Sequence, residues 1–85
     1  MDKRIRIRLF ASLREALGTA ELAHTTAAAT LGALRDELIA RGGAWAEALG
    51  RHRPVRVALN QAMAAEEAAL PDGAEVAFFP PVTGG

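Results

Sequence analysis

The sequence predicts an α+β fold in which one mixed β-sheet packs against a single layer of helices. Short segments in which apolar residues alternate with polar ones, the period-two pattern of half-buried strands, flank one longer segment with helical periodicity. Each element has only one apolar face, so two layers are the simplest way to bury them all. At 85 residues the chain is expected to form one domain with a small core. The expected core residues are Ile5, Ile7, Leu9, Leu34, Leu38, Val57, Val76 and Phe78.

The first strand is the clearest element of the sequence. Between residues 3 and 10, isoleucine or leucine alternates strictly with arginine. A short helix is expected over residues 11–17, with Ser12 available as its cap and Gly18 as its stop. Residues 20–25 form a weak second strand.

The main helix is expected to begin at Thr30, whose side chain can cap it. Its apolar stripe consists of Leu31, Leu34, Leu38 and Ile39. The helix should end at Gly42–Gly43, because glycine readily adopts the left-handed conformation that ends helices. Residues 44–49 then predict one or two further helical turns that cover the core.

The last part of the chain predicts two more strands. Residues 55–60 alternate and lead into a turn at Asn60–Gln61, while residues 71–73 give a stronger turn signal, Pro-Asp-Gly. Residues 75–79 form the closing strand, with Val76 and Phe78 on its core face. Between them, residues 64–69 are rich in alanine and glutamate and could be partly helical.

Composition excludes several classes of function. Ten basic and ten acidic residues cancel, so no global field draws the chain to nucleic acid or to an anionic membrane. The charge is nevertheless uneven, at +4 over residues 1–14 and −4 over residues 66–75. Such segments are usually solvated faces, which can lie beside each other, and a docking role is the alternative.

Reactive side chains are scarce. The chain has no cysteine, which removes disulfides, thiolate metal sites and cysteine nucleophiles together. His24 and His52 lack the short spacing of a helical metal pair, so no metal site is expected. No apolar run is long enough to span a bilayer, and no signal-peptide pattern follows the basic start. A cytoplasmic protein is expected.

The C-terminal segment carries the functional prediction. Pro80 and Pro81 lack N–H donors and cannot continue the last strand, so residues 80–85 should project as an extended tail from a domain of residues 1–79. Gly84 and Gly85 have no Cβ and could pass through a narrow channel. The alternative is a frayed end without function. The terminal carboxylate is a poor electrophile, so a nucleotide-dependent partner would have to activate it. The chain is therefore interpreted as a carrier rather than as a catalyst on its own.

A family resemblance extends over nearly the whole chain. Residues 76–85, Val-Ala-Phe-Phe-Pro-Pro-Val-Thr-Gly-Gly, closely resemble the end of the small subunit of molybdopterin synthase. Further matches are Phe-Ala-Ser-Leu-Arg-Glu at residues 10–15, Thr-Leu-Gly-Ala-Leu at residues 30–34, Trp45 and Asn60–Gln61. The resemblance implies a ubiquitin-like β-grasp fold.

The resemblance also implies a mechanism. An adenylyltransferase related to ubiquitin-activating enzymes uses ATP to adenylate Gly85, and a sulfur donor then converts it to a thiocarboxylate. The tail enters the large synthase subunit, where sulfur passes to cyclic pyranopterin monophosphate. Gly84 gives access, and the chain itself binds no cofactor. The residues expected to contact the partner are Phe79, Pro80, Pro81, Val82 and Thr83.

Other functions remain open at this point. A sulfur carrier of another pathway, for thiamine or cysteine, would use the same terminal glycine, although thiamine carriers usually lack the Phe-Pro-Pro-Val run. A ubiquitin-like modifier would form an isopeptide bond with it, and an interaction domain would not need it. Strand alternation places Phe79 opposite the core, where it either anchors a partner, or covers a neighbouring arginine or packs on the edge of its own domain.

Overall fold

The computed structural model describes residues 2–80, so the expectations for residues 81–85 lie outside the described part of the chain. Within it, a five-stranded sheet has the strand order β2-β1-β5-β3-β4. In chain order the elements are β1 (Lys3–Leu9), α1 (Ala11–Leu17), β2 (Glu21–Thr26), α2 (Leu31–Ile39), α3 (Gly43–Leu49), β3 (Arg56–Leu59), β4 (Ala62–Met63) and β5 (Glu75–Phe79).

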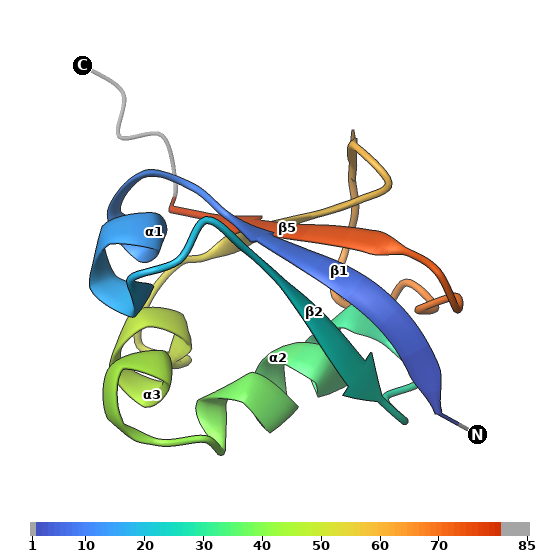
Figure 1. Ribbon diagram of the computed structural model, residues 1–85, viewed down its shortest axis with the longest axis horizontal. Coiled ribbons are helices and arrows are strands. Elements are labelled where there is room, and N and C mark those ends of the chain that lie inside the picture. Colours follow the sequence, from blue (N-terminus) through green and yellow to red (C-terminus); the bar gives the residue numbers. More distant parts are fainter. Residues whose placement is uncertain (1, 81–85) are drawn as a thin grey trace.

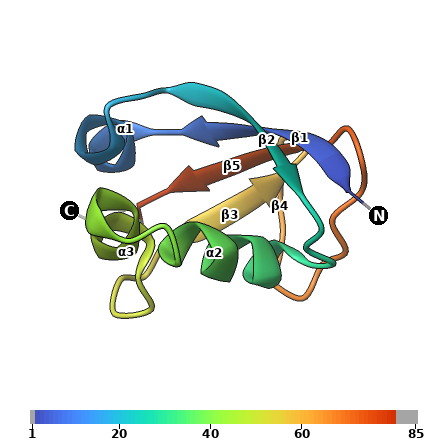
Figure 2. The same cartoon turned by 60° about the horizontal axis from the view of Figure 1, so that its bottom comes forward.

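The fold has two layers, as the sequence predicts. Figures 1 and 2 show the three labelled helices on one side of the sheet. No helix of residues 2–80 lies on the opposite side, which is called here the outer face. The strands β1 and β5 run parallel in the centre of the sheet, and the other neighbouring strands are antiparallel. The α+β prediction is confirmed.

The core lies between the sheet and the helices. All eight residues expected there are buried, and Ile7, Leu34, Leu38 and Val76 have no exposed surface. Alternation along β1 and β5 is confirmed as well, since Val76 and Phe78 face the core. The helices and loops add four large side chains to it: Leu13, Leu31, Leu49 and Leu70. Burial of these side chains is the main force that holds the two layers together.

The helix ends follow the sequence in part. The Thr30 hydroxyl accepts a hydrogen bond from the Ala33 N–H (3.1 Å), which confirms the predicted cap. Gly18 ends α1 in the left-handed region (φ 71°), also as predicted. The cap proposed at Ser12 is wrong, because α1 begins directly after Phe10 and no side chain caps it. The helix α2 ends at Ile39, and Gly42 instead precedes α3.

Residues 64–70 form no helix, despite their helix-favouring composition. Their backbone satisfies the N-terminal end of α2: the Gly32 N–H donates to the Glu66 carbonyl oxygen (2.8 Å), and the Leu31 N–H donates to that of Ala68 (3.1 Å). The first N–H groups of a helix have no partner within it, so an outside acceptor is favourable. This tertiary demand outweighs the weak intrinsic preference for helix.

Both predicted turns are present. Asn60 and Gln61 have positive φ angles (49° and 69°) and connect β3 to β4 as a two-residue hairpin. The turn before β5 contains Gly73 at φ 79°. Among residues 2–80, no helix combines the length and the apolar character needed to cross a membrane.

Candidate functional site

The strand β5 ends at Phe79, directly before residues 80–85, the C-terminal tail of the sequence prediction. On one edge β5 pairs with β1, and on the other Phe79 lies opposite Arg56 of β3. The Phe10 N–H also donates to the Phe78 carbonyl oxygen (3.3 Å). Phe79 and Pro80 are both half-buried. The root of the tail is therefore held from both sides, at the point where a proline removes the next ladder donor.

An aromatic pair marks this root. The rings of Phe10 and Phe79 meet edge to face, with centroids 6.2 Å apart and an interplanar angle of 82°. The guanidinium carbon of Arg8 lies 5.1 Å from the centroid of the Phe10 ring, a cation–π contact. Phe79 thus packs against its own domain, yet 37% of the Phe10 surface stays exposed. A partner that covers this pair would gain apolar contact area with little ordering of side chains.

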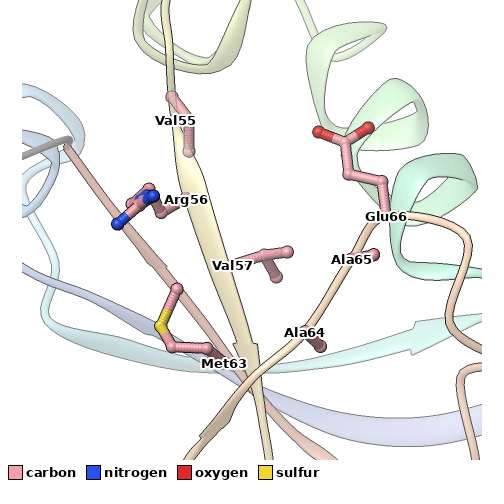
Figure 3. Close-up of a pocket in the computed structure, with 7 residues that line it drawn as sticks. All are labelled: Val55, Arg56, Val57, Met63, Ala64, Ala65 and Glu66. Atoms are coloured by element: carbon pink, nitrogen blue, oxygen red, sulfur yellow. The ribbon is translucent and has the colours of Figure 1, made fainter.

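Met63 adds a third apolar side chain to the outer face. It lies opposite Ala58 in the sheet and is 58% exposed. In Figure 3 the side chains of Arg56 and Met63 lie on the same side of β3, and Val57 points to the other side. We call Phe10, Met63 and Phe79, which share the outer face, the apolar patch; β3 lies between Met63 and Phe79. Exposed apolar side chains on one face often mark protein interfaces.

Among the described residues, a surface hollow of about 440 Å³ beside β3 is lined by two charged residues, Arg56 and Glu66, and by no histidine or hydroxyl. The full lining is Val55, Arg56, Val57, Met63, Ala64, Ala65 and Glu66. Among residues 2–80 no cluster of three metal-ligating side chains occurs either.

One polar cluster lies elsewhere, between β2 and α2. His24 Nε2 is 2.6 Å from one carboxylate oxygen of Glu37, and the Thr26 hydroxyl donates to the other (2.8 Å). Burial raises the pKa of Glu37, but the hydrogen bonds with His24 and Thr26 and the nearby charges together lower it by more. The pKa of Glu37 therefore lies below its usual value. The cluster connects a strand to a helix on the inner side of the sheet, and β1 lies between its strand and β5.

Comparison with known proteins identifies the family. The family model described as "ThiS family" matches residues 7–85. The chain belongs to the ThiS family. Among its curated relatives, the molybdopterin synthase sulfur carrier subunit of Haemophilus influenzae is 40% identical to this chain. The match covers 95% of this chain and 99% of the relative.

Solved structures similar to this ThiS-family chain share its fold. Small archaeal modifier protein 1 of Haloferax volcanii has a TM-score of 0.73 at 28% identity, over 94% of this chain and 99% of that chain. A protein–protein complex of subunits 1 and 2 of molybdopterin-converting factor from Helicobacter pylori contains a chain with a TM-score of 0.62 at 24% identity, over 96% and 99% of the two chains. The second likeness concerns the fold alone.

The site predicted for this ThiS-family chain is only partly within the described residues. Phe79 and Pro80 lie at the root of the tail, whereas Pro81, Val82, Thr83, Gly84 and Gly85 lie outside the described part. Sequence reasoning missed Phe10 and Met63. Phe10 follows the first strand directly, but only the pairing of Leu9 with Phe78 brings it to the tail. That pairing has no local signal in the sequence.

Proposed function

We propose that this chain is a sulfur carrier of molybdenum cofactor biosynthesis, which carries sulfur as a thiocarboxylate on Gly85. Within molybdopterin synthase it would give this sulfur to cyclic pyranopterin monophosphate. The observation that carries the proposal is the 40% identity to a molybdopterin synthase sulfur carrier subunit over nearly the full length of both chains. The apolar patch at the root of the tail supports it, because a carrier must dock on enzymes that act on its end.

The chemistry is that of a carrier and needs partners. A terminal carboxylate has a pKa of about 3.3 to 3.7 and is ionised at neutral pH, so it resists nucleophilic attack. An adenylyltransferase would convert it with ATP to an acyl adenylate and release pyrophosphate. Sulfur from a donor then displaces AMP and leaves the thiocarboxylate. ATP is consumed by the activating partner, and the chain itself supplies no thiol, since it has no cysteine.

The large synthase subunit is the proposed receiving partner. The relative from Haemophilus influenzae is named as a subunit of the synthase, and the Helicobacter pylori protein of the same fold was solved in a complex of two subunits. In this chain the apolar patch would dock on that partner while residues 80–85 extend into it. The two terminal glycines have no Cβ and suit a narrow channel.

Mass spectrometry of the intact chain tests the proposal directly. Incubation with the cognate activating enzyme, ATP and sulfide should replace one oxygen of the Gly85 carboxylate by sulfur. The same mixture without ATP is the control and should leave the mass unchanged. An unchanged mass in the complete mixture, with pyrophosphate exchange proving that the activating enzyme is competent, would contradict the proposal.

Phe79→Ala should weaken binding to the large subunit by about 2 kcal/mol or more, as truncation of an interface aromatic often does. Its neighbour Phe78, only 1% exposed, gives the matched control. Phe78→Ala should lower the free energy of unfolding by roughly 3 to 5 kcal/mol, because it leaves a core cavity, and Phe79→Ala should lower it less. Calorimetric titration and denaturant melts measure both quantities. Unchanged affinity for the Phe79 variant, or equal destabilisation by both, would mean that the docking face is wrongly assigned.

A protein modifier is the second candidate, and the likeness to small archaeal modifier protein 1 favours it. In that function the activated Gly85 carboxyl would form an isopeptide bond with a lysine of another protein. Recovery of such conjugates from cells, lost when Gly85 is removed, would support it. A sulfur carrier for thiamine or cysteine would yield the thiocarboxylate without passing sulfur to the pterin.

A further inference from the structure

The outer face of β1 is lined by arginine. Arg4, Arg6 and Arg8 alternate with the buried Ile5, Ile7 and Leu9 and therefore all point away from the core. Across the sheet, Arg56 of β3 lies on this face beside Phe79, with which it is in register. The neutral chain thus carries four arginines on one side of its sheet. Neither the core nor the proposed chemistry of the tail requires them.

Three carboxylates reach the same face and balance part of this charge. Glu21 lies 3.3 Å from Arg6 and 4.0 Å from Arg8, and Glu75 lies 3.8 Å from Arg8. Asp72 uses one oxygen to accept the backbone N–H of Arg4 (2.8 Å). No carboxylate of the described residues lies within 4.0 Å of the guanidinium groups of Arg4 or Arg56. The face keeps positive charge at two separated points.

Only one of the two points borders the aromatic rings. Arg56 is the cross-strand neighbour of Phe79 and Arg8 stacks on Phe10, whereas Arg4 lies at the opposite end of β1. A protein that covers the rings and extends along β1 therefore meets the whole arginine face. Charges at the rim of an apolar contact mainly steer the encounter and fix its orientation. We infer that the outer face docks on an acidic surface of the protein that receives the tail, with Arg4 and Arg56 as its steering charges.

The chemistry favours a protein over a nucleic acid or a membrane. Glu21 and Glu75 lie between the arginines, and a continuous array of phosphates would be repelled by them. A folded partner can place single carboxylates opposite Arg4 and Arg56 and avoid these acids. This inference rests on the proposed function, since it assigns the partner to the event in which the tail is received.

The double variant Arg4→Gln/Arg56→Gln tests the inference, with Arg41→Glu as a control that changes the net charge by the same amount. Arg41 lies beyond α2 in the helical layer, where its guanidinium carbon lies 4.8 Å from the centroid of the Trp45 ring. Association with the cognate large subunit is followed by stopped flow at low and high salt. At low salt, the association rate of the double variant should be lower than that of the wild type by a factor of about five or more. The double variant should also lose most of the salt dependence that the wild type shows. The control should stay within about twofold of the wild type.

Each outcome bears on one statement. Equal association rates for the double variant and the wild type would overturn the inference. The proposed function would still stand if binding to the large subunit depends on the tail. An equal loss in Arg41→Glu would assign the effect to net charge and overturn it as well. If the wild type is retained on anionic vesicles or duplex DNA and shows no salt-dependent binding to the large subunit, the outer face binds a membrane or a nucleic acid instead, and the inference is overturned. Failure of the wild type to bind the large subunit at all would contradict the proposed function itself. Thermal melts establish that each variant is folded.

Discussion

Removing Gly84 and Gly85 will end sulfur transfer and leave the thermal midpoint of the domain nearly unchanged. Both glycines follow β5 in the chain and have no side chain to bury, and among residues 2–80 the last large side chain of the core is Phe78. The deletion removes the Gly85 carboxylate and leaves a terminal carboxylate on Thr83, at the end of a tail that is two residues shorter. A transfer assay with activating enzyme, ATP and sulfide, together with a melt followed by circular dichroism, measures the two effects separately.

A chain of the same length separates chemistry from access. In the variant Gly84→Ala/Gly85→Ala the terminal carboxylate remains, so adenylation is chemically possible, but each new Cβ widens the tail. Transfer should fall strongly while the melt again stays unchanged. Loss of cooperative unfolding in the truncated chain would show that the tail is structural. Transfer that survives the truncation, with no sulfur on the new Thr83 carboxylate by intact-mass spectrometry, would show that Gly85 does not carry the sulfur.

Replacing Arg35 by Met will destabilise the fold more than any surface substitution. Its side chain is only 5% exposed and donates four hydrogen bonds: to the carbonyl oxygens of Leu49 (2.7 Å), Gly50 (2.9 Å) and Arg53 (2.9 Å), and to Glu66 (2.7 Å). Methionine fills similar space but leaves these acceptors without their donor. Removing one partner of a buried charged network typically costs about 3 to 5 kcal/mol. A domain of this length is stable by roughly 4 to 13 kcal/mol, so the variant will be marginal.

Arg51→Met is the matched control for this prediction. Arg51 also binds Glu66, as well as Asp36, but its side chain is 48% exposed. An exposed pair contributes about 1 kcal/mol or less, so this variant should melt in denaturant close to the wild type. Burial raises the pKa of Glu66, but the hydrogen bonds from Arg51 and Arg35 and their charges together lower it by more, so the pKa of Glu66 lies below its usual value. Equal losses in the two variants would mean that burial of Arg35 is not what matters.

The strands were predictable because their signals are local. Alternation alone located the strand that begins at Lys3, and a single threonine located the start of α2. The order of the strands was not predictable in this way. That β1 lies beside β5 depends on how the two layers pack, and no residue in either strand specifies its neighbour. Phe10 could not be assigned to the root of the tail for that reason.

The remaining errors also have a tertiary cause. Arginine is rarely buried, so the sequence gave no reason to expect Arg35 to be buried beside the leucines of α2. Only the four hydrogen-bond acceptors around its side chain explain its position. Residues 64–69 looked helical by composition, but α2 needs their carbonyl groups. For residues 80–85, residue chemistry supported a functional proposal without a structure, since two prolines and two glycines restrict the conformations and contacts open to the segment.

The parallel pairing of the first and last strands also affects how the chain is made. Because β5 lies between β1 and β3, the sheet cannot close until Glu75–Phe79 has been synthesised. At about 5 to 20 residues per second, β1 must wait several seconds for this neighbour. Chains interrupted before β5 therefore expose the core face of β1 and become substrates for chaperones or proteases. Biosynthetic quality control would remove them before they could compete with intact chains for the proposed activating enzyme.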